Sequence, residues 1–254
     1  MPNGYTPPKL SGETQIPHEL YENAKSYEFI LRDVFYNYHI INFSGYKWRV
    51  KTSSSKLDPG LNYFSDSKDN VWVDKQGYLH LKLTYHNNKW YCAEVICDKS
   101  FGYGKYIFYL GSRIEQLDKN IVLGLFTFDD DPESNHRELD IEFSRWGDST
   151  NLKNSQFVVQ PFYVTGNQYR FKTQLTDADS VHYFDWKRNS ILFKSVFGSD
   201  PERGVVISSY KYTGSYIPPP GNEKPRISLW LMNGLAPSNS LEAEVIIKKF
   251  GFVP

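Results

Sequence analysis

Apolar and polar residues alternate with a period of two along most of this chain. The run 78–85 reads Tyr-Leu-His-Leu-Lys-Leu-Thr-Tyr, and turn-forming residues stand on both sides of it, at 74–77 and 86–89. Successive side chains of a β-strand point to opposite faces, so this alternation predicts strands rather than helices. No long amphipathic helix interrupts the pattern. We therefore expect an all-β protein of antiparallel strands.

Short strands separated by turns recur along the whole chain. Strands are predicted at 71–73, 78–85, 90–96, 103–110, 122–128, 139–143, 156–159, 191–195, 227–230 and 242–250. Short strands in this number close into two packed sheets, which predicts a two-sheet antiparallel β-sandwich. A length of 254 residues suits one such domain, and no Pro-, Gly- or Ser-rich linker divides it. We expect an N-terminal arm or linker over 1–26 and one domain over 27–254.

Composition narrows the classes of partner. Lys and Arg together number 29, as do Asp and Glu, and no basic cluster points to nucleic acid. No apolar run reaches the length of a membrane span, so no membrane partner is expected, and residues 1–5 do not resemble a signal peptide. Cys92 and Cys97 lie five apart in one predicted strand and so point to opposite faces, which favours two buried free thiols over a disulfide.

Three carboxylates fall on one face of the chain around the predicted strand 139–143. Glu138, Asp140 and Glu142 alternate with apolar residues. Carboxylates at this spacing repel one another and raise each other's pKa, and Asp and Glu are poor strand formers. One interpretation is a solvated surface face. The other is a catalytic site that needs one ionised and one protonated carboxyl group.

The run 138–142 fits the E-x-D-x-E motif of glycoside hydrolase family 16, the laminarinase and lichenase group. Further segments resemble that family in the same order, namely 90–94 with 101–106 ("AE … YGYGxYE"), 125–128, 182–193 and 228–230. The resemblance spans residues 45–253. It implies a concanavalin-like jelly roll with a substrate cleft across its concave sheet.

The resemblance also implies catalytic roles. Glu138 would be the nucleophile, Glu142 the acid/base, and Asp140 would share a proton or hydrogen bond with the nucleophile. A retaining glycosidase needs two carboxyl groups about 5 Å apart. Residues i and i+4 of a strand are about 13 Å apart along the backbone, and side chains that lean together close much of that gap. Asp140 could instead be a bystander that fits the alternation.

Substrate contacts are carried over in the same way. Glu94 matches a position that hydrogen-bonds sugar hydroxyls, and Trp230 matches a cleft aromatic residue, although either could be structural. Gln160 and Asn62 lie near polar positions of the family. Phe126 and Phe128 point to one side of their strand, and we expect at least one of them in the core. His136 is the remaining candidate for a substrate contact.

The chain departs from the family pattern at three of these positions. His136 stands where the family commonly has Trp, Ile96 where lichenases have Arg, and Ser228 where the family has Asn. These departures affect the expected substrate more than the reaction. One hypothesis is that His136 and Arg137 bind an anionic sugar; the alternative is an ion pair with Asp130 or Asp131.

The resemblance thus implies a retaining endo-acting glycoside hydrolase of a β-linked polysaccharide, with β-glucan first and galactan-type substrates next. A lectin-like jelly roll and a transglycosylase that uses the same carboxylates are the alternatives. No cofactor is expected, and no metal, because Lys248, Lys249 and Gly251 occupy the region of the family's calcium ligand. The protein is expected to be a monomer, and the family resemblance implies a secreted or cell-surface location.

Overall fold

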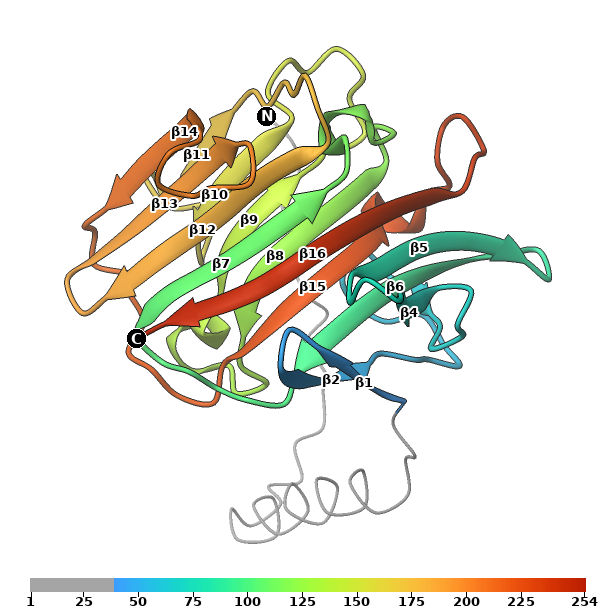
Figure 1. The fold of residues 1–254 in the computed structure, drawn as a ribbon, viewed down its shortest axis with the longest axis horizontal. Helices are drawn as coiled ribbons and strands as arrows, with labels where there is room; N and C mark the ends of the chain where they lie inside the picture. The colour runs from blue at the N-terminus through green and yellow to red at the C-terminus, as the bar shows by residue number, and fades with distance from the viewer. Residues whose placement is uncertain (1–38) are drawn as a thin grey trace, which may run out of the picture. The chain divides into compact units, whose positions relative to one another are not determined.

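The computed structural model of this protein describes residues 39–254. The predicted boundary between residues 26 and 27 lies outside the described residues. Residues 39–254 form sixteen strands joined by turns and three short 3-10 segments (Figure 1). None of the helical segments in this range is long and apolar enough to cross a membrane.

The strands follow one another along the chain with few long connections. Their bounds are β1 (Ile40–Phe43), β2 (Tyr46–Val50), β3 (Tyr63–Phe64), β4 (Val71–Val73), β5 (Leu79–His86), β6 (Lys89–Cys97), β7 (Gly104–Gly111), β8 (Ile121–Phe128), β9 (Leu139–Phe143), β10 (Ser155–Val159), β11 (Gln168–Phe171), β12 (Asp179–Lys187), β13 (Ser190–Phe197), β14 (Val205–Tyr212), β15 (Lys224–Leu231) and β16 (Ala243–Val253). The 3-10 segments are η1 (Ile114–Gln116), η2 (Glu133–Arg137) and η3 (Met232–Gly234).

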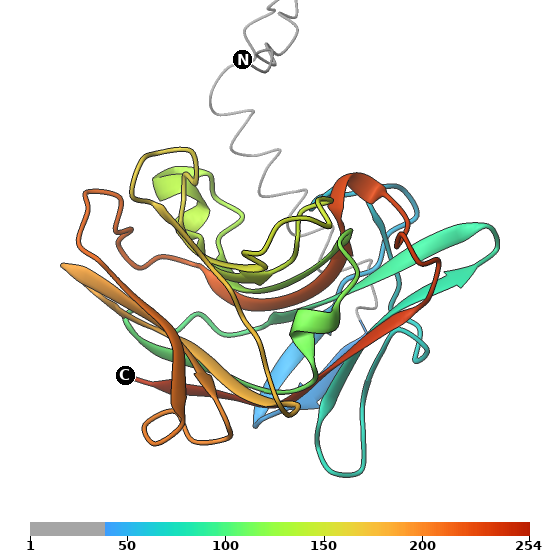
Figure 2. The ribbon, with the colours of Figure 1, turned by 90° about the horizontal axis from the view of Figure 1, so that it is seen from above.

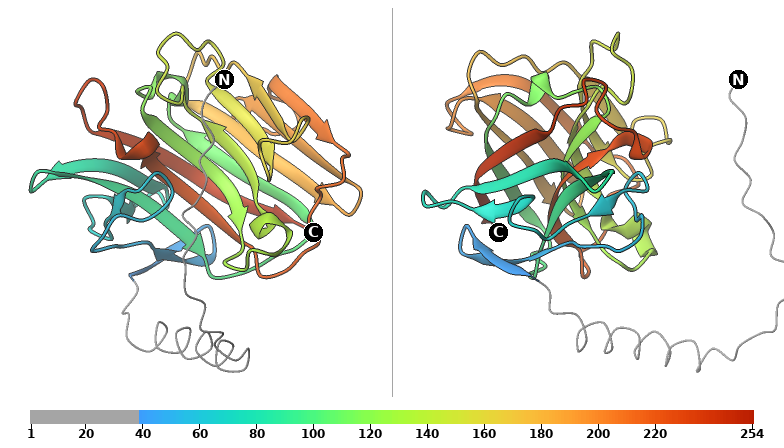
Figure 3. Two further views of the ribbon diagram at one scale, coloured as in Figure 1. Left: turned by 180° about the vertical axis from the view of Figure 1, so that it is seen from behind. Right: turned by 90° about the vertical axis from the view of Figure 1, so that its right-hand side faces the viewer.

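These strands make two curved layers, which Figure 2 shows edge-on and Figure 3 shows from behind and from the side. One sheet, called the front sheet below although its strands β8, β9 and β15 lie behind β7, β12 and β16 in Figure 1, has the order β11-β10-β9-β8-β15-β6-β2-β1. The back sheet has the order β4-β5-β16-β7-β12-β13-β14, and the β5–β6 hairpin joins the two. All pairings are antiparallel except that of β3 with β6. The predicted two-sheet antiparallel sandwich is confirmed.

The hydrophobic core lies between the two sheets. Leu139, Ile141 and Phe143 of β9 are at most 1% exposed and belong to this core. From the back sheet, Phe184 and Phe193 pack with ring centroids 5.9 Å apart. Burying side chains of this size stabilises a fold by about 1.5–3 kcal/mol each. The core fixes β9 with its apolar residues inward, so its alternate residues face the other side of the sheet.

Both cysteines of the chain are free and buried, as predicted. Burial disfavours the charged thiolate and raises the pKa of Cys92 to about 12 and that of Cys97 to about 11. Neither thiol is exposed to solvent.

Candidate active site

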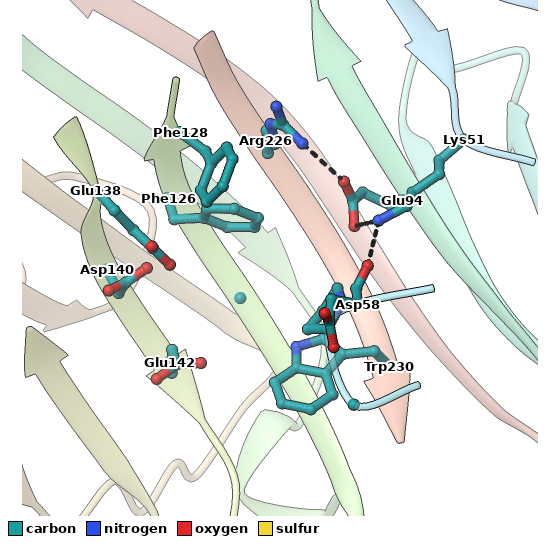
Figure 4. Close-up of a pocket in the computed structure, with 13 residues that line it drawn as sticks. Lys51, Asp58, Glu94, Phe126, Phe128, Glu138, Asp140, Glu142, Arg226 and Trp230 are labelled. Carbon is teal, nitrogen blue, oxygen red and sulfur yellow. Dashed lines mark hydrogen bonds and ion pairs between the residues drawn. The ribbon is translucent and has the colours of Figure 1, made fainter. Parts of the chain in front are cut away.

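Glu138, Asp140 and Glu142 line one cavity of about 470 Å³ on the outer, concave face of the front sheet (Figure 4). Asp140 and Glu142 belong to β9, and Glu138 precedes it in an extended conformation at φ −89° and ψ 122°. The predicted common face is therefore present, and it forms a cavity wall rather than an open surface. Asp140 is only 3% exposed.

Strand register sets six residues in one row across the front sheet. Each is the Cα partner of the next, in the order Arg170 (β11), Gln156 (β10), Glu142 (β9), Gly124 (β8), Ser228 (β15) and Glu94 (β6). Adjacent strands lie about 4.8 Å apart, so two strand spacings separate Arg170 from Glu142 by about 10 Å. Gly124 has no side chain and leaves space beside Glu142. The site is therefore a groove that crosses the strands.

The wall opposite the carboxylates is built by three strands and a loop. Its residues are Lys51, Asp58, Pro59, Gly60, Glu94, Gly124, Phe126, Phe128, Arg226 and Trp230. Figure 4 shows Glu138, Asp140 and Glu142 on one side, with Lys51, Glu94 and Arg226 on the other. The cavity thus combines an acidic wall with aromatic rings and a paired set of charges.

Burial and mutual repulsion raise the pKa of Glu138 and that of Asp140. Burial, and then the charge of Glu142, raise the pKa of Glu138 to about 7, while a hydrogen bond with Asp140 opposes this rise. Burial and the charge of Glu138 raise the pKa of Asp140 well above its ordinary value. The shared hydrogen bond lowers the pKa of Glu138 and raises that of Asp140, so Asp140 is the donor in it. This leaves Glu138 as the group that ionises beside a neutral neighbour.

Glu142 is held by the neighbouring strand. Gln156 Nε2 donates a hydrogen bond of 2.5 Å to Glu142 Oε2, and Gln168 Nε2 donates one of 3.0 Å to Gln156 Oε1. Burial raises the pKa of Glu142, and the hydrogen bond from Gln156 and the charge of Arg170 oppose that rise. Glu142 is thus fixed in orientation, and its pKa lies above its ordinary value.

Glu94 is 1% exposed and carries one uncommitted oxygen. Its Oε2 accepts hydrogen bonds of 3.1 Å from both Lys51 Nζ and Ser228 Oγ. Its Oε1 lies 3.5 Å from the Arg226 guanidinium and accepts no hydrogen bond within the described range. The Glu94 Oε1 atom can therefore accept a hydrogen bond from a ligand hydroxyl.

The structure accounts for two of the departures from the family pattern. Ser228, in place of Asn, donates to Glu94. Ile96, on β6, stands where lichenases have Arg. Its Cα partner on the neighbouring strand β15 is Arg226, and the Arg226 guanidinium lines the cavity.

Both Phe126 and Phe128 line the cavity, so the expectation that at least one lies in the core was wrong. The opposite face of β8, with fully buried Leu123 and Leu125, already supplies the core. Phe128 is enclosed in a stack: the Arg226 guanidinium carbon lies 4.5 Å from its ring centroid. The His136 ring also stacks on the Phe128 ring, with ring centroids 4.6 Å apart and an angle of 12° between the ring planes. His136 therefore contacts the cavity through Phe128.

Arg137 forms an ion pair, but with a different acid from the two we named. Its Nη1 lies 3.0 Å from Asp129 Oδ2, and both side chains are buried, whereas Asp130 pairs with Arg226. The Asp129 carboxylate also accepts the backbone N–H of Asn222. With its guanidinium committed to Asp129, Arg137 is a structural anchor for the turn that leads into Glu138.

That turn has an uncommon backbone. Ser134, Asn135, His136 and Arg137 all have positive φ, between 49° and 60°. Consecutive non-glycine residues in the left-handed region are costly and require surrounding contacts to hold them. Two of those contacts are the Arg137–Asp129 pair and a hydrogen bond from Thr127 Oγ1 to the Arg137 carbonyl.

The two remaining candidates lie in different places. Gln160 Nε2 donates a hydrogen bond of 3.1 Å to Asp140 Oδ2, which brings it to the carboxylates. Asn62 is buried behind the cavity wall, where its Nδ2 donates to the carbonyls of Pro59 and Leu231 at 2.8 Å. Asn62 thereby holds the loop that carries Asp58 to Gly60.

Sequence reasoning missed several residues of the site: Lys51, Asp58, Gln156, Arg170 and Arg226. Arg226 could have been found, because it precedes Ser228 by two and so shares its strand face. The others have no local motif, since the fold alone brings them to the groove.

No protein-family model matches the chain, and a comparison with curated proteins found no match. Solved structures do match. A β-glucanase of Bacillus licheniformis superimposes with a TM-score of 0.60 at 18% identity, covering 87% of this chain and 95% of that one. The fold is the jelly roll of β-glucanases. A family 16 endo-glucanase of Bacteroides ovatus shares this jelly roll at a TM-score of 0.59 and 13% identity, over 81% of this chain and 94% of its own.

One further jelly-roll neighbour is described as a pseudo β-1,3-glucanase of Mycobacterium tuberculosis. It matches with a TM-score of 0.58 at 17% identity, over 79% of this chain and 88% of that one. Proteins with this fold are thus described both as glucanases and as a pseudo-glucanase. The fold alone does not establish an activity, so the function has to be argued from the site.

Proposed function

We propose that this protein is a retaining glycoside hydrolase that cleaves a β-linked polysaccharide, a β-glucan first, within the polymer. The observation that carries the proposal is the shared cavity of Glu138, Asp140 and Glu142, in which burial raises the pKa of each carboxyl group, so that the cavity can hold an ionised and a protonated carboxyl group together near neutral pH. A retaining glycosidase requires one ionised and one protonated carboxyl group. The glucanase neighbours of the fold support the substrate class.

The reaction proceeds in two displacements. The Glu138 carboxylate attacks the anomeric carbon, the glycosidic C–O bond breaks, and Glu142 gives its proton to the leaving oxygen. Glu142, now a carboxylate, takes a proton from water, and the water oxygen attacks the anomeric carbon and releases Glu138. Asp140 positions Glu138 through their hydrogen bond, and Gln156 positions Glu142.

Cleavage within the polymer is supported by open space on both sides of Glu142. Besides the cavity of 470 Å³, a second one of about 300 Å³ is also lined by Glu142 and Trp230. A polysaccharide lying along the groove can extend past the reacting bond in both directions. On the side of the first cavity, Glu94 Oε1 would accept a sugar hydroxyl, and Trp230 would offer an apolar ring face.

A sugar-binding protein without activity is the competing function, because one neighbour of the same fold is described as a pseudo-glucanase. The first test is incubation of the protein with mixed-linkage, β-1,3- and β-1,4-glucans and with galactans, followed by mass spectrometry of the products. We expect oligosaccharides from one polymer, with proton NMR showing a β-anomer as the first product. Retention of a polymer without any cleavage would establish the binding function instead, and an α-anomer would contradict the double displacement.

The pH profile gives a separate prediction for Asp140. Its hydrogen bond lowers the pKa of Glu138, so Asp140→Ala should raise that pKa and move the acidic limb of kcat/KM to higher pH. Asp140→Asn keeps an N–H donor beside Glu138 and should move the limb less. The measurement is kcat/KM from pH 4 to pH 9 for both variants. Identical acidic limbs in all three proteins would show that Asp140 is a bystander.

A further inference from the structure

The second cavity of the groove lies beyond Glu142, over strands β10 and β11. It shares Glu142 and Trp230 with the first cavity, and its remaining wall includes Trp146, Phe162 and Arg170. Glu138 and Asp140 line only the first cavity. If Glu138 holds the sugar on the side that becomes covalently bound, the leaving part of the polymer extends past Glu142 into the second cavity.

Arg170 is the unusual residue of that cavity. Its Nε and Nη2 atoms are buried and donate no hydrogen bond within residues 39–254. No carboxylate in this range lies within ion-pair distance of it, and its guanidinium carbon lies 3.9 Å from the Trp146 ring centroid. A guanidinium is always charged in proteins, and although the Arg170 side chain as a whole is only half-buried, buried N–H groups such as these two normally have a partner. Stacking on Trp146 offsets part of this cost and leaves the positive charge unneutralised.

The neighbouring polar groups do not satisfy Arg170. Gln156, its Cα partner, uses its Nε2 on Glu142 and accepts at Oε1 from Gln168. The charge of Glu142, two strands from Arg170, favours the charged guanidinium without an ion pair between them, and this carboxyl group is neutral when it acts as the acid. The cavity therefore presents one cation, fixed by a tryptophan face, to whatever occupies it.

We propose that this second cavity is a leaving-group subsite that takes a sugar with an anionic substituent, a carboxylate or a sulfate ester, paired with Arg170. The inference rests on the proposed function, because the roles of Glu138 and Glu142 define the side of the leaving group. The planar fork of a guanidinium binds carboxylate or sulfate oxygens in pairs. Trp146 and Phe162 supply apolar faces for the ring of the sugar.

The subsite also suits product release. Once Glu142 has given up its proton it is anionic, and it repels an anionic leaving group across the row from β9 to β11. The sequence suggested that His136 and Arg137 bind an anionic sugar. The subsite proposed here places anion binding at Arg170 instead, in the second cavity of the groove. Arg137 is already paired with Asp129, whereas no carboxylate in the described part of the chain lies within ion-pair distance of Arg170.

The experiment measures binding by calorimetry to the inactive variant Glu138→Gln, so that no ligand is consumed. The probes are three size-matched sets of oligosaccharides: neutral, carboxylated and sulfated. They are prepared from the polymer that the wild type cleaves, or from every polymer of the panel if none is cleaved. Arg170→Gln and Arg170→Lys are added to this background. The matched control is Arg203→Gln, because the Arg203 side chain is 90% exposed and lies outside both cavities.

We expect one anionic set to bind about tenfold more tightly than the neutral set, and which set does so distinguishes carboxylate from sulfate. Arg170→Gln should remove that advantage and leave neutral affinity unchanged, Arg170→Lys should keep part of it, and Arg203→Gln should change nothing. Potassium chloride at high concentration should weaken only the anionic advantage, a readout in the Glu138→Gln background that needs no Arg170 variant to fold.

Equal affinity for neutral and anionic sets would overturn the subsite while leaving the glycosidase proposal intact. So would an equal loss of affinity for all sets in folded Arg170→Gln, which would make Arg170 a structural support for the Trp146 loop. Failure of every saccharide to bind or be cleaved would instead overturn the proposed function, and the subsite with it.

Discussion

Glu138→Ala and Glu142→Ala are each expected to lower kcat on a polysaccharide by about 10³-fold or more, because each removes a group that acts in the transition state. The two variants should differ on an aryl glycoside whose leaving group needs no proton. Glu142→Ala should still form the glycosyl-enzyme on this substrate, whereas Glu138→Ala should not. Initial rates on both substrates give the comparison.

Azide separates the two roles further. With Glu142→Ala, azide attacks the glycosyl-enzyme and should give a β-glycosyl azide; with Glu138→Ala, azide enters the space left by the nucleophile and should give the α-anomer. Glu202→Ala, whose side chain is 67% exposed outside the groove, serves as the control and should keep wild-type activity. The opposite pattern of anomers would exchange the roles of Glu138 and Glu142.

The second large effect is expected on stability. Arg137→Met should lower the free energy of unfolding by about 3–5 kcal/mol, because it leaves the buried Asp129 carboxylate without its cation. The left-handed turn before Glu138 also loses a contact that holds it. Urea unfolding followed by tryptophan fluorescence measures the change, and kcat should fall as the position of Glu138 becomes less defined.

Two further variants test the cause. Adding Asp129→Asn to Arg137→Met removes the unpaired charge and should restore part of the stability. Arg203→Met, at an exposed position, should change the free energy of unfolding by no more than about 0.5 kcal/mol. If Arg203→Met proved as destabilising as Arg137→Met, the Asp129 pair could not be the source of the loss.

The fold and the acidic wall could be predicted from local sequence because both depend on alternation. The predicted strand 139–143 coincides with β9, and the alternation of its residues put the three carboxylates on one face. Strand β12 was not predicted. Six of its nine residues are buried, and they lie on both faces of the strand, so its sequence lacks the alternation of a half-buried strand.

The electrostatic part of the site could not be predicted in this way. Arg226 and Glu94 are far apart in the sequence, and they meet only because β15 pairs with β6 in one register. Arg170 lies beside Gln156 and two strands from Glu142 through the pairing of β9, β10 and β11. A register shift of one residue would turn these side chains to the other face of the sheet, so their roles follow from tertiary structure.

The two buried thiols have a practical consequence for experiments on this protein. A maleimide dye reacts with an exposed thiolate, and neither Cys92 nor Cys97 offers one at neutral pH. A single cysteine introduced at Leu152, which is 75% exposed, would therefore be the only fast-labelling position in the folded chain. The wild-type sequence can serve directly as the background for fluorescence measurements of saccharide binding, with no cysteine to remove first.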